Sequence, residues 1–347
     1  MTLRILLIMD PFIAVPPQHY GGIERVIADL ANGLHQRGHE VTLWAAPGSS
    51  IQGKVVPFGR ESEWTRWSNI RNTVYLSSRL WGLRGKVDLI HNFGRLAYLT
   101  SVLRWDLPKV QTYMRTVDAN NMILARRLGE RRLHYTAVSA AIRDTGAPGG
   151  GEWSVIYNCA PVEQFTFRGD TDPATAPLVF LGRLERCKGA HTAIAIARQA
   201  GRKLIIAGNI SSLPHEQKYF HEEIEPQLDG GQTNYIGPVD NAAKNRLLGN
   251  AAALLMPIEF EEPFPVVLPE ALLCGTPVIA FRRGGVPEGI DHGRTGFLCD
   301  TKEEMVAAVQ HLSKIDRAVC RAEAIRRFSD DAILGEYEQL YYRLLAS

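Results

Sequence analysis

Short apolar runs alternate with segments of helical periodicity along the chain, and this alternation restricts the fold more than any other sequence feature. Arg4–Met9 is a continuous apolar run, as in strands buried on both faces of a parallel sheet. A proline-rich loop ending in Gly21-Gly22 follows. Ile23–Arg37 then carries apolar residues at helical spacing, and Val41–Ala45 returns to a strand pattern. Strand, loop, helix and strand in this order predict the start of a doubly wound α/β sheet.

The same alternation continues to the end of the chain. Further strands are expected at Val87–His91, Lys109–Tyr113, Thr136–Val138, Ser154–Tyr157, Leu178–Leu181, Lys203–Ala207, Tyr235–Ile236, Ala253–Met256 and Pro277–Ala280. Helices are expected at Ala190–Ala200, Ala242–Leu248, Lys302–Ser313 and Arg317–Arg327, with another ending near Leu273. The segment RGDTDPATAP has the composition of a linker. We therefore expect two Rossmann-like domains, residues 1–165 and 166–329, followed by an amphipathic helix over 330–347. This helix could pack on either domain, and the architecture we favour has it crossing back to the first.

Length and charge limit the classes of function. A chain of 347 residues is long enough for two domains. Its 39 Lys and Arg against 37 Asp and Glu give a net charge of +2, which argues against a nucleic-acid partner. Residues 1–160 carry a net charge of +7 and residues 161–347 a net charge of −5. The basic half either faces an anionic partner, or both halves present solvated surfaces.

Cysteine usage and the N-terminal segment indicate the compartment. The five cysteines are scattered, with no C-x-x-C pair and no metal-ligand spacing with histidine. This pattern predicts reduced thiols, a cytoplasmic protein and no structural zinc. We expect no other metal site and no cofactor. The apolar run before Asp10 is too short for a signal peptide or a membrane span.

The segment Pro257–Ala280 carries the highest density of chemically informative residues. Glu262 and Glu270 lie eight positions apart. Pro265 favours an extended loop, whereas Pro269 fits the first turn of a helix, where a missing N–H costs nothing. The two glutamates would then flank a helix N-terminus. The alternative is a pair of surface glutamates around an ordinary connection.

Groups that favour anions occur nearby. The backbone N–H groups of Val266 and Val267 would point out of the helix N-terminus, which is an anion-binding arrangement. Arg183 and Lys188 follow the strand at Leu178–Leu181 and would converge at its carboxyl end. Arginine presents a planar fork of donors to phosphate and lysine a point charge. Each cation taken alone could equally be solvated.

These segments together resemble the retaining GT-B glycosyltransferases of family 4. The spacing of Glu262 and Glu270 is similar to the E-x7-E motif of that family. The segments that carry the resemblance are YGGIERVIADLANGLHQRGHEVTLWA, DLIHNF, AVSAAI, VIYNCAPVEQF, GRLERCKG, EEPFPVVLPEALLCGTPVIA, GGVPE and GRTGFL. The resemblance runs from residue 4 to about residue 300. It implies two Rossmann-like domains facing a cleft, with an acceptor site on the first and a nucleotide-sugar site on the second.

The resemblance also implies roles for individual residues. Arg183 and Lys188 would bind the diphosphate, Glu270 the ribose hydroxyls, and Glu262 the hydroxyls of the donor sugar. The remaining nucleotide-sugar contacts would come from Gly21, Gly22, Pro238, Val239, Phe264, Pro265, Val266 and Val267. Catalytic residues would be Glu262, Arg183, Lys188 and His91.

Two positions depart from the family pattern. Pro265 stands where the family often has glycine, so one backbone N–H toward the donor sugar is missing. Met114 stands near the place of a histidine that approaches the sugar. His91 is the nearest remaining histidine in the pattern, and it is either that group or simply a strand-end residue.

The resemblance implies a retaining, metal-independent transfer from a UDP- or GDP-sugar to an acceptor hydroxyl. The acceptor is a secondary metabolite, a glycan or a lipid. The alternatives are a GT-B sugar-nucleotide epimerase and a non-catalytic sugar-nucleotide binding protein. A Rossmann dehydrogenase is disfavoured because no G-x-G-x-x-G follows the first strand.

Two basic segments remain. Glu63–Lys86 interleaves tryptophans with arginines, and Trp67, Ile70, Val74 and Trp81 fit one helical face. We expect this face to pack into the core, with peripheral contact to an anionic membrane or a role in an acceptor groove as alternatives. The second segment holds Arg126, Arg127, Arg131 and Arg132, and is expected to be a solvated face.

Overall fold

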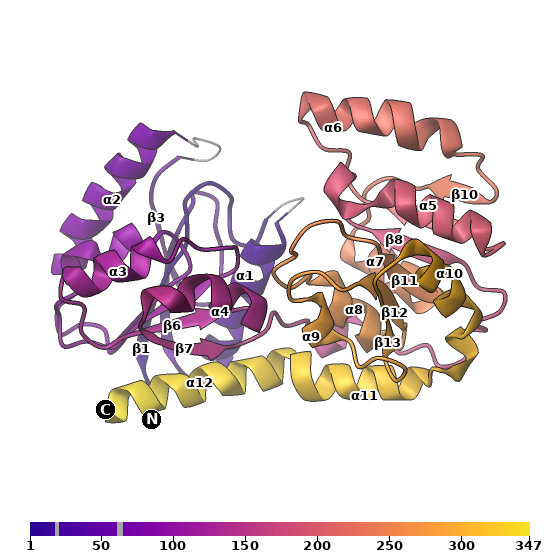
Figure 1. Cartoon of the computed structure of the whole chain (residues 1–347). Coiled ribbons are helices and arrows are strands. Elements are labelled where there is room, and N and C mark those ends of the chain that lie inside the picture. Colours follow the sequence, from indigo (N-terminus) through magenta and orange to yellow (C-terminus); the bar gives the residue numbers. More distant parts are fainter. Residues whose placement is uncertain (18–20, 61–64) are drawn as a thin grey trace. The chain divides into compact units, whose positions relative to one another are not determined.

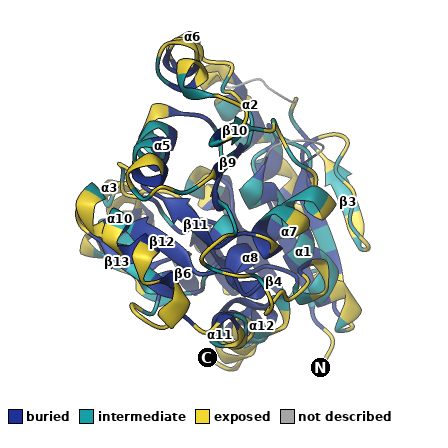
Figure 2. Cartoon of the chain, turned by 90° about the vertical axis from the view of Figure 1, so that its right-hand side faces the viewer, coloured by how far each residue is buried: buried dark blue, intermediate teal, exposed yellow. Residues whose placement is uncertain are grey.

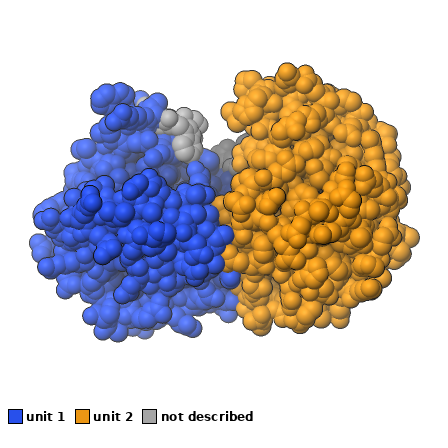
Figure 3. Space-filling view, viewed as in Figure 1, with its two compact units in different colours: residues 1–158, 330–347 blue, residues 159–329 orange. Residues whose placement is uncertain are grey.

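The computed structural model describes residues 1–17, 21–60 and 65–347 as two compact units. Unit 1 comprises Met1–Asn158 and Asp330–Ser347, and unit 2 comprises Cys159–Ser329 (Figure 3). The chain therefore leaves unit 1 earlier than the expected boundary after residue 165. The linker-like segment lies within unit 2, where the Arg168 N–H donates to the Cys274 carbonyl. The Thr166 N–H likewise donates to Asn245 Oδ1.

Unit 1 is built on a parallel seven-stranded sheet in the order β3-β2-β1-β4-β5-β6-β7. Figure 1 shows this sheet among helices α1, α2, α3 and α4. The strands are β1 (Arg4–Ile8), β2 (Glu40–Ala45), β3 (Lys54–Pro57), β4 (Leu89–Asn92), β5 (Lys109–Tyr113), β6 (Leu133–Ala137) and β7 (Glu152–Val155). Its helices are α1 (Gly22–Gln36), α2 (Arg66–Trp81), η1 (Leu96–Val102), α3 (Asn120–Arg127), α4 (Ala140–Gly146) and α12 (Asp330–Ala346). The strand order reverses between β1 and β4, which is the topological switch point of a doubly wound sheet.

Unit 2 has a parallel six-stranded sheet in the order β10-β9-β8-β11-β12-β13. The strands are β8 (Leu178–Leu181), β9 (Leu204–Ala207), β10 (Thr233–Tyr235), β11 (Ala253–Met256), β12 (Val278–Phe281) and β13 (Gly296–Cys299). The helices are α5 (Ala190–Gln199), α6 (Pro214–Tyr219), α7 (Asn241–Gly249), α8 (Val267–Leu273), α9 (Val286–Gly289), α10 (Lys302–Gln310) and α11 (Arg317–Phe328). Strands β8 and β11 are neighbours, so the loops that follow them meet at one edge.

The central strands are buried on both faces, as their continuous apolar runs predict (Figure 2). The short strands β3 and β13 were not predicted from the sequence. They lie at the edges of the two sheets and are four residues long, so each leaves only a short pattern. Both sheets confirm the doubly wound α/β class, and α12 belongs to unit 1. There the Leu334 side chain comes so close to Gly33 of α1 that a Cβ on that glycine would lie 2.3 Å from it.

Helix α2 is turned the opposite way from the sequence expectation. Its buried face consists of Ser68, Asn72, Leu76 and Leu80, of which the two leucines join the core beneath α2, η1 and α3. The apolar residues Trp67, Ile70, Val74 and Trp81 are instead exposed. The expectation that the apolar stripe faces the core was therefore wrong. The row from Ser68 to Leu80, spaced by four residues and half polar, packs on the core instead. Glu63 and Trp64 of the same segment lie outside the described residues.

Candidate functional site

Lys188 and Glu262 meet at the carboxyl edge of the sheet in unit 2. Lys188 follows β8 and Glu262 follows β11, and these strands are adjacent. The Nζ of Lys188 lies 2.5 Å from Oε2 of Glu262, and their side chains are 18% and 11% exposed. Lys188 Nζ also lies 4.8 Å from the centre of the Phe260 ring. The first glutamate of the motif is thus fixed by a cation from the neighbouring loop.

The second glutamate of the motif has a lysine of its own. Glu270 on α8 forms an ion pair with Lys244 on α7, and both side chains are nearly buried. The Lys244 ammonium lies 5.4 Å from the centre of the Phe165 ring. Sequence reasoning missed Lys244, because its partner lies 26 positions further along the chain and no spacing rule connects the two. The ion pair therefore fixes the orientation of the Glu270 side chain, and Lys244 balances the charge of its carboxylate.

Arg183 follows β8 directly and forms an ion pair with Glu185. The distance from Arg183 Nη1 to Glu185 Oε1 is 2.5 Å. The guanidinium-bearing side chain is 38% exposed, whereas that of Glu185 is 10% exposed. No sequence motif singled out Glu185. Arg183 is thus tethered at one side while a third of its side chain faces solvent.

Two glycines allow the loops of this site to approach one another. Gly189 has a φ of +79°, and a Cβ there would lie 2.0 Å from the carbonyl oxygen of Pro257. A Cβ on Gly284 would lie 2.2 Å from the carbonyl oxygen of Glu262, and the Gly285 N–H donates to that oxygen. Only glycine tolerates both the left-handed conformation and the contact. The loops after β8, β11 and β12 therefore hold Glu262 by its backbone as well as by Lys188.

The other predicted donor-side residues of unit 2 differ in exposure. Pro238 and Val239 lie in the partly exposed loop between β10 and α7, and Val266 and Val267 are half-buried at the start of α8. Phe264 is buried, with its ring centre 5.4 Å from that of Phe328. The Phe264 side chain therefore belongs to the core of unit 2, and only its backbone is left for a ligand. Pro265 is also buried.

Gly21 and Gly22 lie on unit 1, where Gly22 begins α1. Gly21 has a φ of +154°, and a Cβ there would lie 2.7 Å from Oε2 of Glu24. Glu24 is buried, and burial raises the pKa of its carboxyl group. The glycine therefore makes room for a buried carboxylate that the sequence did not single out. Residues 18–20 of the same loop lie outside the described residues.

His91 is a structural residue in this fold, which corrects its expected catalytic role. It is fully buried between the sheet and α12. Hydrogen bonds of 2.6 Å join Nδ1 to the Tyr341 hydroxyl and Nε2 to the Thr112 hydroxyl. Burial holds the pKa of His91 well below its usual range. Because both ring nitrogens are engaged in the interior, His91 cannot contact a sugar.

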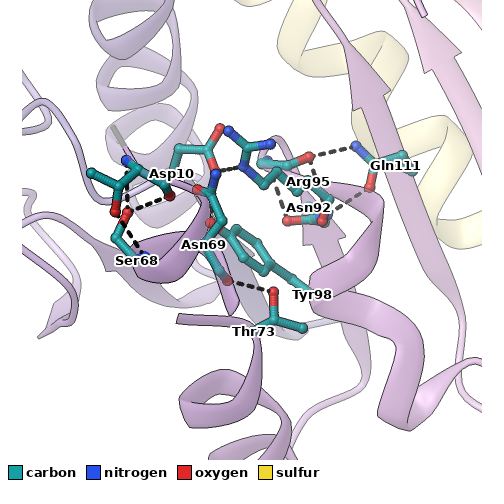
Figure 4. Close-up of polar contacts among 10 residues, drawn as sticks. Asp10, Ser68, Asn69, Thr73, Asn92, Arg95, Tyr98 and Gln111 are labelled. Carbon is teal, nitrogen blue, oxygen red and sulfur yellow. Dashed lines mark hydrogen bonds and ion pairs between the residues drawn. The ribbon is translucent and has the colours of Figure 1, made fainter. Parts of the chain in front are cut away.

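A pocket of about 430 Å³ opens at the carboxyl ends of β1, β4 and β5 in unit 1. It is lined by Met9, Asp10, Ile23, Phe93, Gly94, Arg95, Leu96, Ala97, Thr112, Tyr113, Met114, Arg115, Thr116, Val117, Asp118 and Asn121. Asn92 Nδ2 donates to the Arg95 carbonyl and to Gln111 Oε1, which fixes the wall between β4 and η1 (Figure 4). Sequence reasoning placed only Met114 near this site.

Asp10 is the most perturbed carboxylate of this pocket. The Tyr98 hydroxyl donates to Asp10 Oδ1 at 2.8 Å, and Arg95 Nε lies 3.9 Å from the same oxygen (Figure 4). Burial raises the pKa of Asp10, although the hydrogen bond from Tyr98 and the charges of Arg95 and Arg115 oppose the shift. A partly desolvated carboxylate in a pocket is a candidate for binding or proton transfer.

The part of the chain that the structure describes contains no group of three or more His, Cys, Asp or Glu residues placed to hold a metal ion. Its five cysteines are free thiols, and Cys187 alone among them is not buried. Within the same described residues, no helix has the length and apolar composition needed to cross a membrane.

Comparison with known proteins gives two matching family models. Residues 20–164 match Glycosyltransferase Family 4, and residues 165–327 match Glycosyl transferases group 1. Glycogen synthase from Mycobacterium tuberculosis is 31% identical over 196 residues, which are 54% of this chain and 46% of that protein. The chain thus matches about half the length of this curated relative.

Two solved structures share the fold over nearly their whole length. AviGT4, a glycosyltransferase involved in avilamycin A biosynthesis, is 26% identical with a TM-score of 0.70, covering 99% of this chain and 98% of its own. HepE from Anabaena, solved in complex with UDP-glucose, is 19% identical with a TM-score of 0.74, covering 98% of this chain and 100% of its own. The second of these likenesses concerns the fold alone.

Proposed function

Because the chain belongs to the family 4, group 1 glycosyltransferases, we propose that it transfers a sugar from a UDP- or GDP-sugar to an acceptor hydroxyl, with retention of configuration and without a metal ion. The observation that carries the proposal is the pairing of both motif glutamates with lysines in unit 2. Lys188 with Glu262, and Lys244 with Glu270, bring four charged side chains to the carboxyl edge of one sheet.

The cations of unit 2 would stabilise the leaving group. Departure of a nucleoside diphosphate concentrates negative charge on its terminal phosphate. Arg183 and Lys188 follow β8, and both are already oriented by glutamates. Preorganised donors of this kind stabilise the developing charge without reorganising during the reaction. The proposal therefore assigns to two side chains the task that a divalent cation performs in other transferases.

The glutamates would orient the donor. An ionised carboxylate only accepts hydrogen bonds, so Glu270 and Glu262 fit the vicinal hydroxyls of a ribose and of a hexose. Lys244 and Lys188 each occupy one side of a carboxylate, which leaves the other oxygen for a hydroxyl. Pro238 and Val239, after β10, would lie near the base, and Val266 and Val267 near the phosphates.

The pocket of unit 1 would take the acceptor. Its carboxylate, Asp10, is positioned to accept a hydrogen bond from an acceptor hydroxyl, and Arg95 and Arg115 add positive charge to the lining. The acceptor classes that fit are a secondary metabolite, a glycan or a lipid. AviGT4, a glycosyltransferase involved in avilamycin A biosynthesis, supports the first of these classes.

The test is the Glu262→Gln variant assayed with UDP-glucose, the sugar nucleotide bound by HepE. Calorimetry should show donor binding close to that of the wild type, whereas UDP release falls at least 100-fold. Glu259→Gln is the matched control, because Glu259 follows the same strand but pairs with His191. Turnover of Glu262→Gln within a few fold of the wild type would refute the assignment.

Product analysis separates the reaction classes. Retention is checked by the anomeric proton of the glycoside in NMR, and metal independence by assays in EDTA. An altered sugar on UDP without acceptor would identify an epimerase. Binding of UDP-glucose and GDP-sugars with no turnover over a panel of acceptors would identify a binding protein.

A further inference from the structure

The outer face of α2 is apolar in spite of being exposed to solvent. Trp67 is 79% exposed, Val74 64%, Trp81 59% and Ile70 47%. At about 100° per residue these four side chains fall within an arc of about 60°. The arc lies opposite the row Ser68, Asn72, Leu76 and Leu80 that packs on the sheet. A continuous apolar stripe on an exposed helix marks an interaction surface.

The charges on α2 and the turn that follows it have a single sign. Residues 66–86 contain Arg66, Arg71, Arg79, Arg84 and Lys86, and no aspartate or glutamate. Arg66 and Arg71 lie about 70° to either side of the centre of the stripe on the helical wheel. Cations that flank an apolar stripe with tryptophan are typical of helices that lie flat in the interface of an anionic membrane.

The apolar surface continues beyond α2. Trp81 packs edge-on against Trp105 at 5.8 Å, and the Arg84 guanidinium lies 5.9 Å from the centre of the Trp105 ring. A cavity of about 410 Å³ adjoins them, lined by Trp81, Thr100, Ser101, Arg104, Trp105 and Leu128. On α3 the neighbouring Leu124 is 55% exposed, and Arg126 and Arg127 follow it. The surface thus joins the outer sides of α2, η1 and α3, which cover the same core.

From this geometry we infer that unit 1 binds the surface of an anionic phospholipid membrane through the outer face of α2 and the adjoining end of α3. Trp67, Ile70, Val74 and Trp81 enter the boundary between headgroups and acyl chains. The flanking arginines contact lipid phosphates. The charge pattern favours a lipid surface over a second copy of this chain, because a symmetric contact would bring the same basic face against itself.

The experiment is sedimentation of the full chain with vesicles. Vesicles of equal parts phosphatidylglycerol and phosphatidylcholine should bind the protein, and vesicles of phosphatidylcholine should bind it far less. Arg66→Gln with Arg71→Gln should lower the partition coefficient about 30-fold, since each cation contributes a factor of about five near an anionic surface. Added salt should weaken binding of the wild type for the same reason.

Apolar insertion is tested separately. Ile70→Glu with Val74→Glu should abolish vesicle binding without unfolding the protein, because both side chains are exposed. Leu213→Glu with Ile325→Glu is the control, since these exposed apolar residues lie on unit 2. Brominated lipids should quench the fluorescence of the wild type more strongly than that of Trp67→Phe with Trp81→Phe, in which Trp105 remains.

Three outcomes would overturn the inference. The wild type fails to bind anionic vesicles, the Ile70 and Val74 variant binds them as the wild type does, or sedimentation equilibrium shows a dimer that this variant dissociates. The last outcome would assign the surface to a second copy. UDP binding, measured on the same samples, reports on unit 2 and keeps this test separate from that of the proposed function.

Discussion

At the scale of single residues, Lys188 holds Glu262 and is placed to reach a leaving phosphate. Lys188→Ala should lower kcat about 100- to 1000-fold, equivalent to about 2.7–4 kcal/mol, because a preorganised partner of a developing oxyanion is lost. The KM for the donor should rise less than kcat falls. Steady-state kinetics of this variant and of Lys218→Ala, an exposed lysine on α6, test the expectation. Rescue of the Lys188→Ala variant by Mg²⁺ would contradict the proposal that side chains alone stabilise the leaving phosphate.

Glu270 provides a second prediction at this scale. Loss of its carboxylate removes the proposed ribose contact but no phosphate contact. UDP should therefore bind Glu270→Gln about 10- to 100-fold more weakly, the range expected for hydrogen bonds to a charged group, while pyrophosphate binds as before. Glutamine retains the shape of the side chain beside Lys244. Calorimetry with both ligands decides the point, and equal losses would exclude the ribose role.

Asp10 links the pocket of unit 1 to stability. Burial raises the pKa of Asp10 in the folded protein. Ionising this carboxyl group is therefore less favourable in the folded than in the unfolded chain, and its ionisation lowers the free energy of unfolding. The cost is absent below the unfolded pKa of about 3.9 and grows as the pH rises through the folded value. Asp10→Asn should therefore raise Tm at pH 7 and have little effect at pH 3. A lower Tm at pH 7 would mean that the Tyr98 and Arg95 contacts outweigh burial.

At the scale of elements, α12 is held to the sheet of unit 1 through His91. Tyr341→Phe removes the hydroxyl that bonds Nδ1 of the buried imidazole, which should cost about 1–3 kcal/mol of unfolding free energy in urea. Tyr342→Phe is the control, because its hydroxyl donates to the Met1 carbonyl at the surface. Equal stability of the two variants would show that the hydrogen bond to His91 does not help to hold α12, which Arg37 and His39 also contact through Glu338.

Helix α2 shows how an element can be recognised and yet oriented wrongly. The periodicity of Trp67, Ile70, Val74 and Trp81 correctly indicates a helix. It does not indicate which side faces the protein, because a second row of residues at the same period also exists. Leu76 and Leu80 pack on the core of unit 1, and this contact decides the orientation.

At the scale of the whole molecule, the two units have separate sheets and cores. A ligand that binds unit 2 should stabilise unit 2. Saturating UDP at about 100 times its Kd should add about 2.7 kcal/mol to the stability of the unit that binds it. Scanning calorimetry of the full chain should show a ligand-dependent shift in the part of the transition that belongs to unit 2. Hydrogen exchange identifies which part of the transition belongs to unit 2. A shift confined to unit 1 would show that the nucleotide binds unit 1 instead.

Local patterns in the sequence determined the doubly wound α/β class, the positions of the main strands along the chain and the choice of the two motif glutamates. Strand runs, helical periods and proline positions act over a few residues, so they can be read without knowing the fold. The edge strands β3 and β13 were not predicted. No residue of β3 (KVVP) is fully buried, so this strand leaves a weak pattern, whereas β13 (GFLC) is mostly buried but is only four residues long and begins with glycine.

Contacts between distant segments were decided by the tertiary structure alone. Only the folded chain brings Lys244 to Glu270, encloses His91 between Thr112 and Tyr341, and turns the tryptophans of α2 outward. Each of these outcomes depends on which surfaces pack together, and the free energy of packing is set by neighbours far apart in the chain. A residue type and its spacing indicate what a side chain can do, whereas its partners and burial determine what it does.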